Sequence, residues 1–410
     1  MKTPPTEDLQ SATTPSLMQI LRTATYIGAV GYGGPAILAL MKQTYVRDKK
    51  WISEQEFMNA LSLSQILPGA TGVTVTGYVG FKLKKIWGGL LAAFGFVTPP
   101  AALMTVLAWA YFRFGQMPFV KSLFAGLGAL VVALLVNAVL VLGRSVFPTI
   151  GLQDWKGLTI ALAGFVGVFL LHINVLWVIL GAGLLGFLLF YFAKTEPPSG
   201  TRARGKTVGA ILVTPRLRAH DFVPGGVVVA IIIAALVMPA TRVLVASFLG
   251  VGTTAFGGGF GSIPLMQSLV VDAHGWLSVK EFLDGIALGQ ITPGPVFITA
   301  TFIGYRVAGV LGAVLATLAI FTPSLAAIML LADLHGRVQN LRSVRSVVSG
   351  LQAGFVGLIL SVAVSFAFKS LLTWQEWLIF LATIGYVVLL KKSTVWAILA
   401  TIAFSFVFIH

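Results

Sequence analysis

The feature that most constrains this chain is an internal duplication. Residues 33–76 align with residues 258–301 at a constant offset of 225 without a gap, and 16 of the 44 positions are identical. The identities include Trp, Gln and Pro-Gly, which drift among apolar residues would not match in register. A duplicated unit interrupted by glycine and proline is typical of secondary transporters.

Composition places the chain in the membrane. Its 410 residues are 57% hydrophobic and only 10% charged, whereas soluble domains carry about 25% charged residues. Cysteine is absent, which excludes disulfides and thiolate chemistry. The net charge of +15 is interpreted as a signal for orientation, because the basic residues lie in short loops rather than on one nucleic-acid-binding face. We therefore expect an all-α polytopic membrane protein.

Two apolar stretches in each half are broken. Glycine or proline clusters interrupt residues 17–41, 54–82, 242–266 and 281–306. Unwound backbone survives in lipid only where protein buries it or where it lines a cavity. We expect discontinuous helices or re-entrant hairpins there.

The expected organisation has five parts. They are a polar cytoplasmic tail (1–16), a first transporter repeat (17–193), a basic cytoplasmic linker (194–221), a linking transmembrane helix (222–240) and a second repeat (241–410).

The linking helix has no counterpart before the first repeat, and one extra crossing would invert the second repeat. The charges agree with inversion, because the loop at 42–50 carries four basic residues while its partner at 267–275 carries none. Under the positive-inside rule, two repeats with the same orientation would place these unlike loops on one side. We therefore predict two inverted-topology repeats.

The two Pro-Gly breaks are the first candidate site. A helix that restarts after a break presents unpaired N–H groups and a positive dipole end, which suits an oxyanion. Glutamine amides and threonine hydroxyls add donors. The alternative is a kink without a ligand. The candidate residues are Gln65, Pro68, Gly69, Thr71, Thr74 and Thr76 in the first half, and Gln290, Pro293, Gly294, Pro295, Thr299 and Thr301 in the second.

The glycine clusters are a second candidate, at Gly33 and Gly34 and at Gly258 and Gly259. They either admit close helix packing or leave backbone N–H groups bare towards a ligand, and the sequence leaves both interpretations open. A nucleotide-binding glycine loop is excluded because no strand precedes either cluster.

Two basic residues align if the second half has a one-residue deletion, Lys82 and Arg306. An intramembrane cation is a candidate partner for an anionic substrate. The alternative is a side chain that extends to the membrane interface.

Acidic residues are scarce in the apolar segments. Glu56 and Glu281 fit helix-start caps, and Asp284 is the one candidate for coupling transport to a proton or cation. The five histidines are scattered, so we expect no metal site and no catalytic set.

The residues of these motifs resemble one family. GYGGPAILALM with WISEQEFMNALSLSQILPG, and FGGGFGSIPLMQ with WLSVKEFLDGIALGQITPGP, look like the two domains of the chromate ion transporter family in its two-domain form. Tyr32 stands where Phe is common, and Ala70 where a second Pro is usual. The resemblance implies inverted halves in a bacterial or archaeal plasma membrane, here a multi-pass inner-membrane protein, and export of chromate, with sulfate as a near-isosteric relative.

We therefore expect a carrier that exports chromate and confers chromate resistance, with no enzymatic activity and no cofactor. Its expected partners are chromate, sulfate as an alternative substrate, and the lipid bilayer, and a homodimer stays open. A carrier for another small anion, a channel and a membrane enzyme acting on lipid remain as alternatives, although no nucleophile or metal set supports the enzyme.

Overall fold

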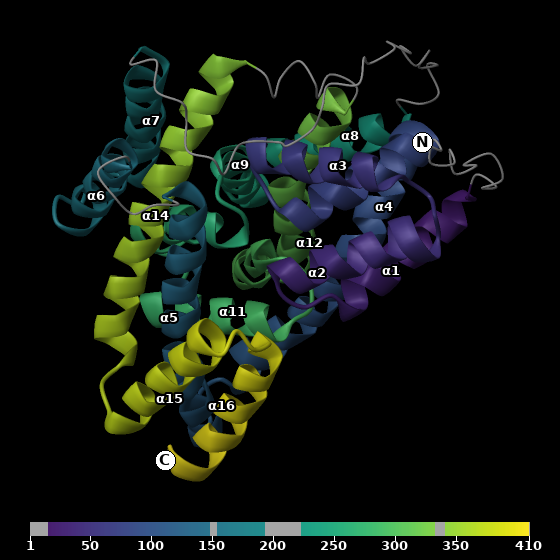
Figure 1. Cartoon of the computed structure of the whole chain (residues 1–410). Coiled ribbons are helices and arrows are strands. Elements are labelled where there is room, and N and C mark those ends of the chain that lie inside the picture. The colour runs from purple at the N-terminus through teal and green to yellow at the C-terminus, as the bar shows by residue number, and fades with distance from the viewer. Residues whose placement is uncertain (1–14, 148–153, 193–222, 333–340, 410) are drawn as a thin grey trace, which may run out of the picture.

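The computed structural model describes residues 15–147, 154–192, 223–332 and 341–409, and these segments form helices without strands (Figure 1). Five of these helices are long and apolar enough to cross a membrane. The expected all-α polytopic membrane protein is confirmed. The basic linker and residues 1–14 of the tail lie outside the described residues.

The first half contains nine helical segments in the described ranges. They are α1 (Leu17–Val30), α2 (Gly34–Lys42), a π-helical continuation (Gln43–Asp48), α3 (Glu54–Ile66), α4 (Thr71–Phe114), α5 (Pro118–Val146), α6 (Trp155–Phe169), α7 (Val175–Gly186) and its π-helical end (Phe187–Phe192).

The rest of the described chain begins with α8 (Val223–Val237), which lies where the linking helix is expected. Then follow α9 (Pro239–Thr254), a 3₁₀ turn (Gly259–Gly261), α10 (Ser262–Gln267), a π-helical continuation (Ser268–Ala273), α11 (Val279–Ile291), a second 3₁₀ turn (Val296–Ile298), α12 (Thr299–Leu331), α14 (Arg342–Ser370), α15 (Trp374–Ile384) with its π-helical end (Gly385–Leu389), and α16 (Thr394–Phe408).

The sequence duplication is also a duplication of local structure. Ser53 and Glu56 form a capping box at the start of α3, and Ser278 and Glu281 form the same box at the start of α11. Each box satisfies two of the N–H groups that a helix start leaves unpaired. The expected capping role of both glutamates is confirmed.

The helices labelled α4 and α12 are helical hairpins. Their backbones turn at Lys84–Lys85 and at Ala308–Gly309 with nearly the same dihedral angles, φ 53° at Lys85 and φ 58° at Gly309. The two turns are 224 residues apart, so the expected one-residue deletion in the second half precedes this turn.

Glycines let the two arms of each hairpin touch. A Cβ added to Gly80 would lie 2.2 Å from the carbonyl oxygen of Gly88, and one added to Gly304 would lie 2.2 Å from that of Gly312. Small residues at such crossings allow backbones to approach closely in membrane proteins. The same residue type therefore closes both hairpins.

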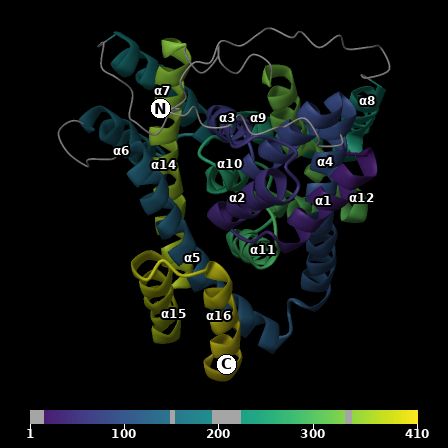
Figure 2. The same ribbon diagram turned by 45° about the vertical axis from the view of Figure 1, so that its right-hand side comes forward.

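The two halves are intertwined. The long helix α5 of the first half packs against α15 and α16 of the second, while α14 of the second half packs against α6 and α7 of the first. The α6–α7 hairpin lies at one end of the molecule and the α15–α16 hairpin at the other, as Figures 1 and 2 show from two directions. This arrangement supports inverted repeats, whose orientation in the membrane stays a prediction.

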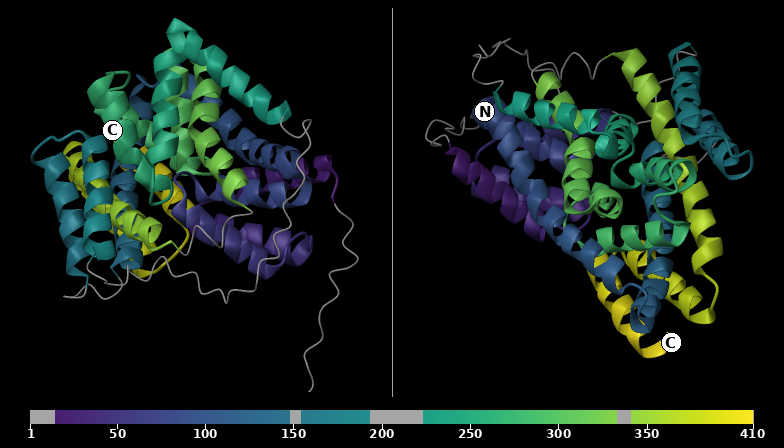
Figure 3. Two further views of the ribbon diagram at one scale, coloured as in Figure 1. Left: turned by 90° about the horizontal axis from the view of Figure 1, so that it is seen from above. Right: turned by 180° about the vertical axis from the view of Figure 1, so that it is seen from behind.

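The hairpins α4 and α12 form the other side of the molecule. They pack against each other, α1 packs on α4, and α9 packs on α12. Seen from behind, these helices form a body beside the α5–α14 pair (Figure 3). The four breaks in the helices lie within or beside this body.

Candidate functional site

Each Pro-Gly break docks on the opposite half of the chain. The N–H of Gly69 donates to the carbonyl oxygen of Ala255 at 2.9 Å, and the N–H of Gly294 donates to that of Gly31 at 2.8 Å. Ala255 and Gly31 are the C-terminal caps of α9 and α1. The two breaks are therefore reciprocal contacts between the halves.

Both positions require glycine. The φ angles of Gly69 and Gly294 are +113° and +105°, a region that side-chain-bearing residues rarely adopt. A Cβ at Gly69 would lie 2.4 Å from the Cβ of Ser324, and a Cβ at Gly294 would lie 3.0 Å from that of Pro100. The breaks are thus held by both backbone conformation and close packing.

The partners of the breaks form a third repeated motif. Thr98-Pro99-Pro100 in α4 and Thr322-Pro323-Ser324 in α12 are separated by 224 residues. We did not single out this motif in the sequence, although the offset of the hairpin turns would have aligned it. It places a surface against each break from the opposite half.

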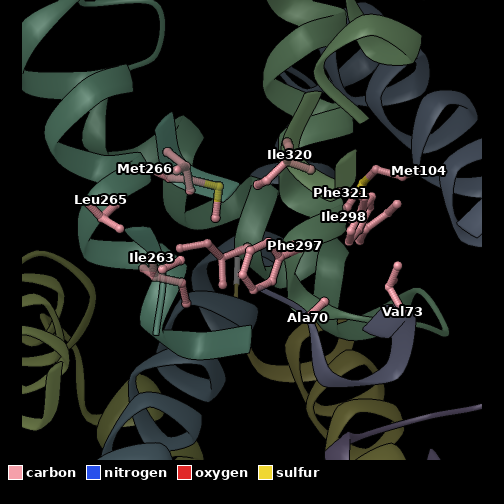
Figure 4. Close-up of a cluster of buried hydrophobic side chains, with 14 of the residues drawn as sticks. Ala70, Val73, Met104, Ile263, Leu265, Met266, Phe297, Ile298, Ile320 and Phe321 are labelled. Carbon is pink, nitrogen blue, oxygen red and sulfur yellow. The ribbon is translucent and has the colours of Figure 1, made fainter. Parts of the chain in front are cut away.

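The surroundings of the breaks are apolar. Figure 4 shows Ala70 and Val73 near Phe297, Ile298 and Phe321 in one buried cluster. The two breaks are therefore held in place by apolar side chains rather than surrounded by water.

Several predicted donors are engaged within the protein. The hydroxyl of Thr74 donates to the carbonyl oxygens of Ala70 and Thr71, and that of Thr299 donates to Val296. Thr76 Oγ1 lies 4.0 Å from the sulfur of Met41, and the hydroxyls of Thr301 and Thr317 are 2.6 Å apart.

The N–H groups of Gly69 and Gly294 themselves are engaged as well. The N–H groups expected to be unpaired belong to the turn after each break, and within those turns the N–H groups of Val73 and Ile298 donate to the carbonyl oxygens of Ala70 and Pro295.

The two matched glutamines lie in different environments. Gln65 is exposed, and its backbone carbonyl oxygen accepts a hydrogen bond from Gln352 Nε2 at 3.4 Å. Gln290 is half-buried, and its Nε2 is buried with no hydrogen-bond partner. A buried amide donor without a partner costs about 1–3 kcal/mol. Gln290 is therefore the predicted site residue that most needs a ligand or water.

The helices that carry the two glutamines, α3 and α11, also differ in how much they are packed against other helices. α11 packs against α5, α12, α4 and α16, whereas α3 packs chiefly against α4. Met58 in α3 is 46% exposed and its counterpart Leu283 in α11 is 4% exposed. One sequence unit thus adopts an open and a closed environment in the same molecule.

The glycine clusters are not needed for close packing at their central positions. Gly33 and Gly258 have φ of +70° and +78°. A Cβ at Gly258 would meet nothing within 4 Å, and one at Gly33 would meet only Thr394 Oγ1 at 3.9 Å. Of the two interpretations left open, conformation with accessible backbone fits these two residues.

The remaining candidate residues of these clusters and breaks lie at the ends of helical elements or beside the break glycines. Gly34 begins α2, Gly259 begins the 3₁₀ turn before α10, Pro68 and Pro293 precede the two break glycines, and Pro295 caps the 3₁₀ turn before α12.

The predicted cations lie away from the breaks. Lys82 and Arg306 sit next to the hairpin turns, and Lys82 is 11 residues, or about 16 Å of helix, from Thr71. Lys82 Nζ lies 5.6 Å from the ring centre of Tyr78, and the Arg306 guanidinium lies 5.6 Å from that of Phe112. The structure does not bring these two residues together with the glutamines.

Asp284 is buried and hydrogen-bonded. It is 3% exposed, and the Tyr111 hydroxyl donates to its Oδ2 at 2.7 Å. Asn59 occupies the matched position in α3. A buried carboxylate with one phenol donor is suited to gain or lose a proton, so its predicted coupling role stays a prediction.

An apolar groove of about 780 Å³ lies between the second arms of α4 and α12. Its lining includes Trp87, Phe94 and Phe321. Moving a dianion into such a groove would remove its hydration without replacing it. This groove suits lipid chains rather than an oxyanion. Within the described residues, no cluster of His, Cys, Asp and Glu could hold a metal.

Comparison with known proteins identifies the family. The model of the chromate transporter family matches residues 18–187 and 242–406. An uncharacterized transporter of Methanocaldococcus jannaschii is 31% identical over 394 residues, which cover 95% of this chain and 94% of that protein.

Two further relatives are named chromate transport proteins. The one from Cupriavidus metallidurans is 29% identical and covers 94% of this chain and 91% of its own length. The one from Pseudomonas aeruginosa is 30% identical and covers 86% and 81%. No solved structure matches the chain. Since the family model spans both halves, the chain belongs to the chromate transporter family.

Proposed function

We propose that this protein is a carrier that exports chromate across the plasma membrane by alternating access. The observation that supports a carrier is the contrast between α3 and α11. A pseudo-symmetric protein exposes its site alternately when the two repeats exchange conformations. Met58 and Leu283 occupy matched positions, and their side chains are 46% and 4% exposed.

The reciprocal contacts of the breaks are the fixed points about which this exchange takes place. Gly69 and Gly294 each bond to the opposite half, and these bonds are related by the same pseudo-symmetry as the repeats. They can persist while α3 closes and α11 opens. Gln65 and Gln290 would then exchange environments, so that each binds the substrate from one side.

Chromate is proposed as substrate because two similar proteins of nearly the same length carry that name. The acid-poor apolar segments agree with an anion. Asp284 and Glu376 are the buried carboxylates among the described residues, and Glu376 Oε2 accepts from the N–H groups of Leu372 and Thr373 at a helix start.

The membrane potential favours export. One charge crossing the membrane changes its free energy by about 2.3 kcal/mol per 100 mV, so a dianion leaving a negative interior gains about 4.6 kcal/mol. That corresponds to a concentration ratio above about a thousandfold, since 1.4 kcal/mol is tenfold. Export therefore needs no coupled cation. Removal of cytoplasmic chromate would confer resistance.

The test is uptake of radiolabelled chromate into inside-out vesicles that contain the protein. An imposed interior-positive potential should increase accumulation, and excess unlabelled chromate should compete. Vesicles with Gln290→Ala protein should show weaker uptake, because that change removes the buried donor of the more enclosed site. Uptake equal to that of protein-free vesicles would refute the proposal. Currents far above carrier rates would indicate a channel instead.

A further inference from the structure

A polar stripe on α14 continues from Gln352, the residue that bonds to Gln65, towards the start of the helix. Arg345, Ser349 and Gln352 are spaced i, i+4 and i+7, so they share one face of the helix. Gln352 Nε2 donates to the backbone carbonyl oxygen of Gln65. This face therefore points to the end of α3 just before the first Pro-Gly break. We call these three residues the α14 stripe.

The stripe contains polar atoms without partners. Arg345 Nε and Ser349 Oγ are buried and make no hydrogen bond, and the neighbouring Ser346 Oγ shares both properties. Ser346 and Ser349 are 0% and 2% exposed. Buried serines in helices usually donate to their own backbone, as Ser361 does to the carbonyl of Leu358 further along α14. The unpaired hydroxyls are thus an exception within one helix.

Unpaired buried donors are costly. Each buried hydroxyl leaves a desolvation penalty of about 1–3 kcal/mol. Arg345 is half-buried, and Nε is its buried atom without a partner. No carboxylate forms a salt bridge with Arg345 in the described part of the chain. A guanidinium and two hydroxyls together match an oxyanion, because the guanidinium fork pairs with two oxygens and the hydroxyls donate to others.

The surrounding charge favours an anion. Arg342 lies one turn before the stripe, with its guanidinium 5.8 Å from the Tyr191 ring centre. Lys156 Nζ donates to the carbonyl oxygen of Leu189 near the same end of α7. These cations raise the local positive potential and draw dianions to this end of the molecule.

Only Arg345 of the stripe has a polar counterpart in the first repeat, because Ala125 and Gly128 occupy the positions that match Ser349 and Gln352. Val120-Lys121-Ser122 in α5 aligns with Val344-Arg345-Ser346 in α14 at the offset of 224 that also relates the hairpin turns. Lys121 is exposed, and Ser122 donates to the carbonyl oxygen of Pro118. α5 packs with α15 and α16, so Lys121 belongs to the opposite end of the molecule. Each end of the carrier thus has one basic residue at the same repeat position.

We propose that Arg345, Ser346 and Ser349 form a binding site for a tetrahedral dianion, beside the open face of α3. The site loads the carrier at the end where the α6–α7 hairpin lies, which the charge distribution assigns to the cytoplasm. Lys121 occupies the same repeat position in α5, but it is exposed at the opposite end, where Ser122 already donates to the carbonyl oxygen of Pro118, so it is not part of this site. The α3 face is open in this structure, so the α14 site is the available one. The inference rests on the proposed function for the identity of the dianion.

The test is equilibrium binding of radiolabelled chromate to the purified full-length protein. Arg345→Gln should weaken binding by about tenfold or more, since a hydrogen bond to a charged group contributes about 1.5–3 kcal/mol. Arg345→Lys should bind with intermediate affinity, because it keeps the charge and loses the planar fork. Ser349→Ala should weaken binding by about threefold to tenfold.

Lys121→Gln is the matched control. It removes a cation from the same repeat position at the other end, and its binding should stay within about twofold of the parent. Thermal unfolding midpoints show which variants fold. If Arg345→Gln does not fold, the binding affinities of Arg345→Lys and Ser349→Ala decide the test. Displacement of labelled chromate by sulfate from the parent would extend the site to both dianions, and its absence would restrict the site to chromate.

Two outcomes would overturn the inference. One is parental affinity in the Arg345 and Ser349 variants, and the other is an equal loss in Lys121→Gln. The flux assay separates this inference from the proposed function. If uptake is driven by the potential but Arg345→Gln binds chromate as the parent does, the proposed function stands and the α14 site is refuted. If chromate binding depends on Arg345 but no uptake occurs, the α14 site stands and the proposed carrier function is refuted.

Discussion

Replacing the first break glycine by alanine tests how the two halves are held together. Gly69 has φ +113°, so an alanine would be strained by about 1–3 kcal/mol. Its Cβ would also lie 2.4 Å from the Cβ of Ser324 in the other half. Overpacking of this kind adds about 1–3 kcal/mol. The expected loss of stability for Gly69→Ala is therefore about 2–6 kcal/mol.

Two other glycines supply internal controls. Gly258 has φ +78° and open space around an added Cβ, so Gly258→Ala should cost only the strain, about 1–3 kcal/mol. Gly294 has φ +105° and a Cβ contact of 3.0 Å with Pro100, so its variant should fall between the two.

The assay is unfolding of the purified variants in detergent by denaturant, with free energies compared at one detergent concentration. The expected order of destabilisation is Gly69→Ala, then Gly294→Ala, then Gly258→Ala. Adding Ser324→Gly to Gly69→Ala should recover part of the loss, because it removes the overlapping Cβ. Equal destabilisation of the Gly69 and Gly258 variants would show that the breaks do not press against the opposite half.

Further predictions concern the caps, the open face and a surface ion pair. Ser53→Ala and Ser278→Ala should each destabilise the protein by about 1 kcal/mol and by similar amounts in the same unfolding assay, since both remove a capping box; a large effect of only one would contradict the structural equivalence of α3 and α11. Met58→Cys should react with a water-soluble maleimide far faster than Leu283→Cys, because their exposures are 46% and 4%; equal rates would contradict the open and closed environments. Lys42 Nζ donates to Glu54 Oε1 at 2.5 Å, and this hydrogen bond with the lysine charge lowers the pKa of the Glu54 carboxyl. The pair therefore contributes stability above the ordinary carboxyl pKa and loses it as the pH falls through the lowered value, so Glu54→Gln should reduce the unfolding midpoint at pH 7 and leave it unchanged in acid.

The sequence predicted the repeats because the residues involved have distinct backbone requirements. Positive-φ glycines, prolines and the Ser-Glu boxes mark helix ends whatever the tertiary context. The breaks at Gly69 and Gly294 and the caps at Glu56 and Glu281 follow from such local rules. The turn at Lys84–Lys85 follows the predicted end of the broken stretch at residue 82, but no sequence rule indicates that a lysine there would adopt a positive φ.

The site was less predictable because it depends on contacts between the halves. Nothing near Gly69 in the sequence indicates that its N–H would bond to Ala255. The matched glutamines suggested equal roles, yet tertiary packing exposes Gln65 and half-buries Gln290. The motifs that the two repeats share do not specify which conformation each repeat adopts, so this asymmetry needed the structure.

The inverted relation of the two repeats is the central claim, and the absence of native cysteine allows a direct test. Lys49 and His274 occupy matched, exposed positions 225 residues apart. Single cysteines at these positions should be labelled by a membrane-impermeant maleimide from opposite sides of sealed vesicles, with Lys49→Cys reacting from the cytoplasmic side. Labelling of both cysteines from the same side would contradict the account.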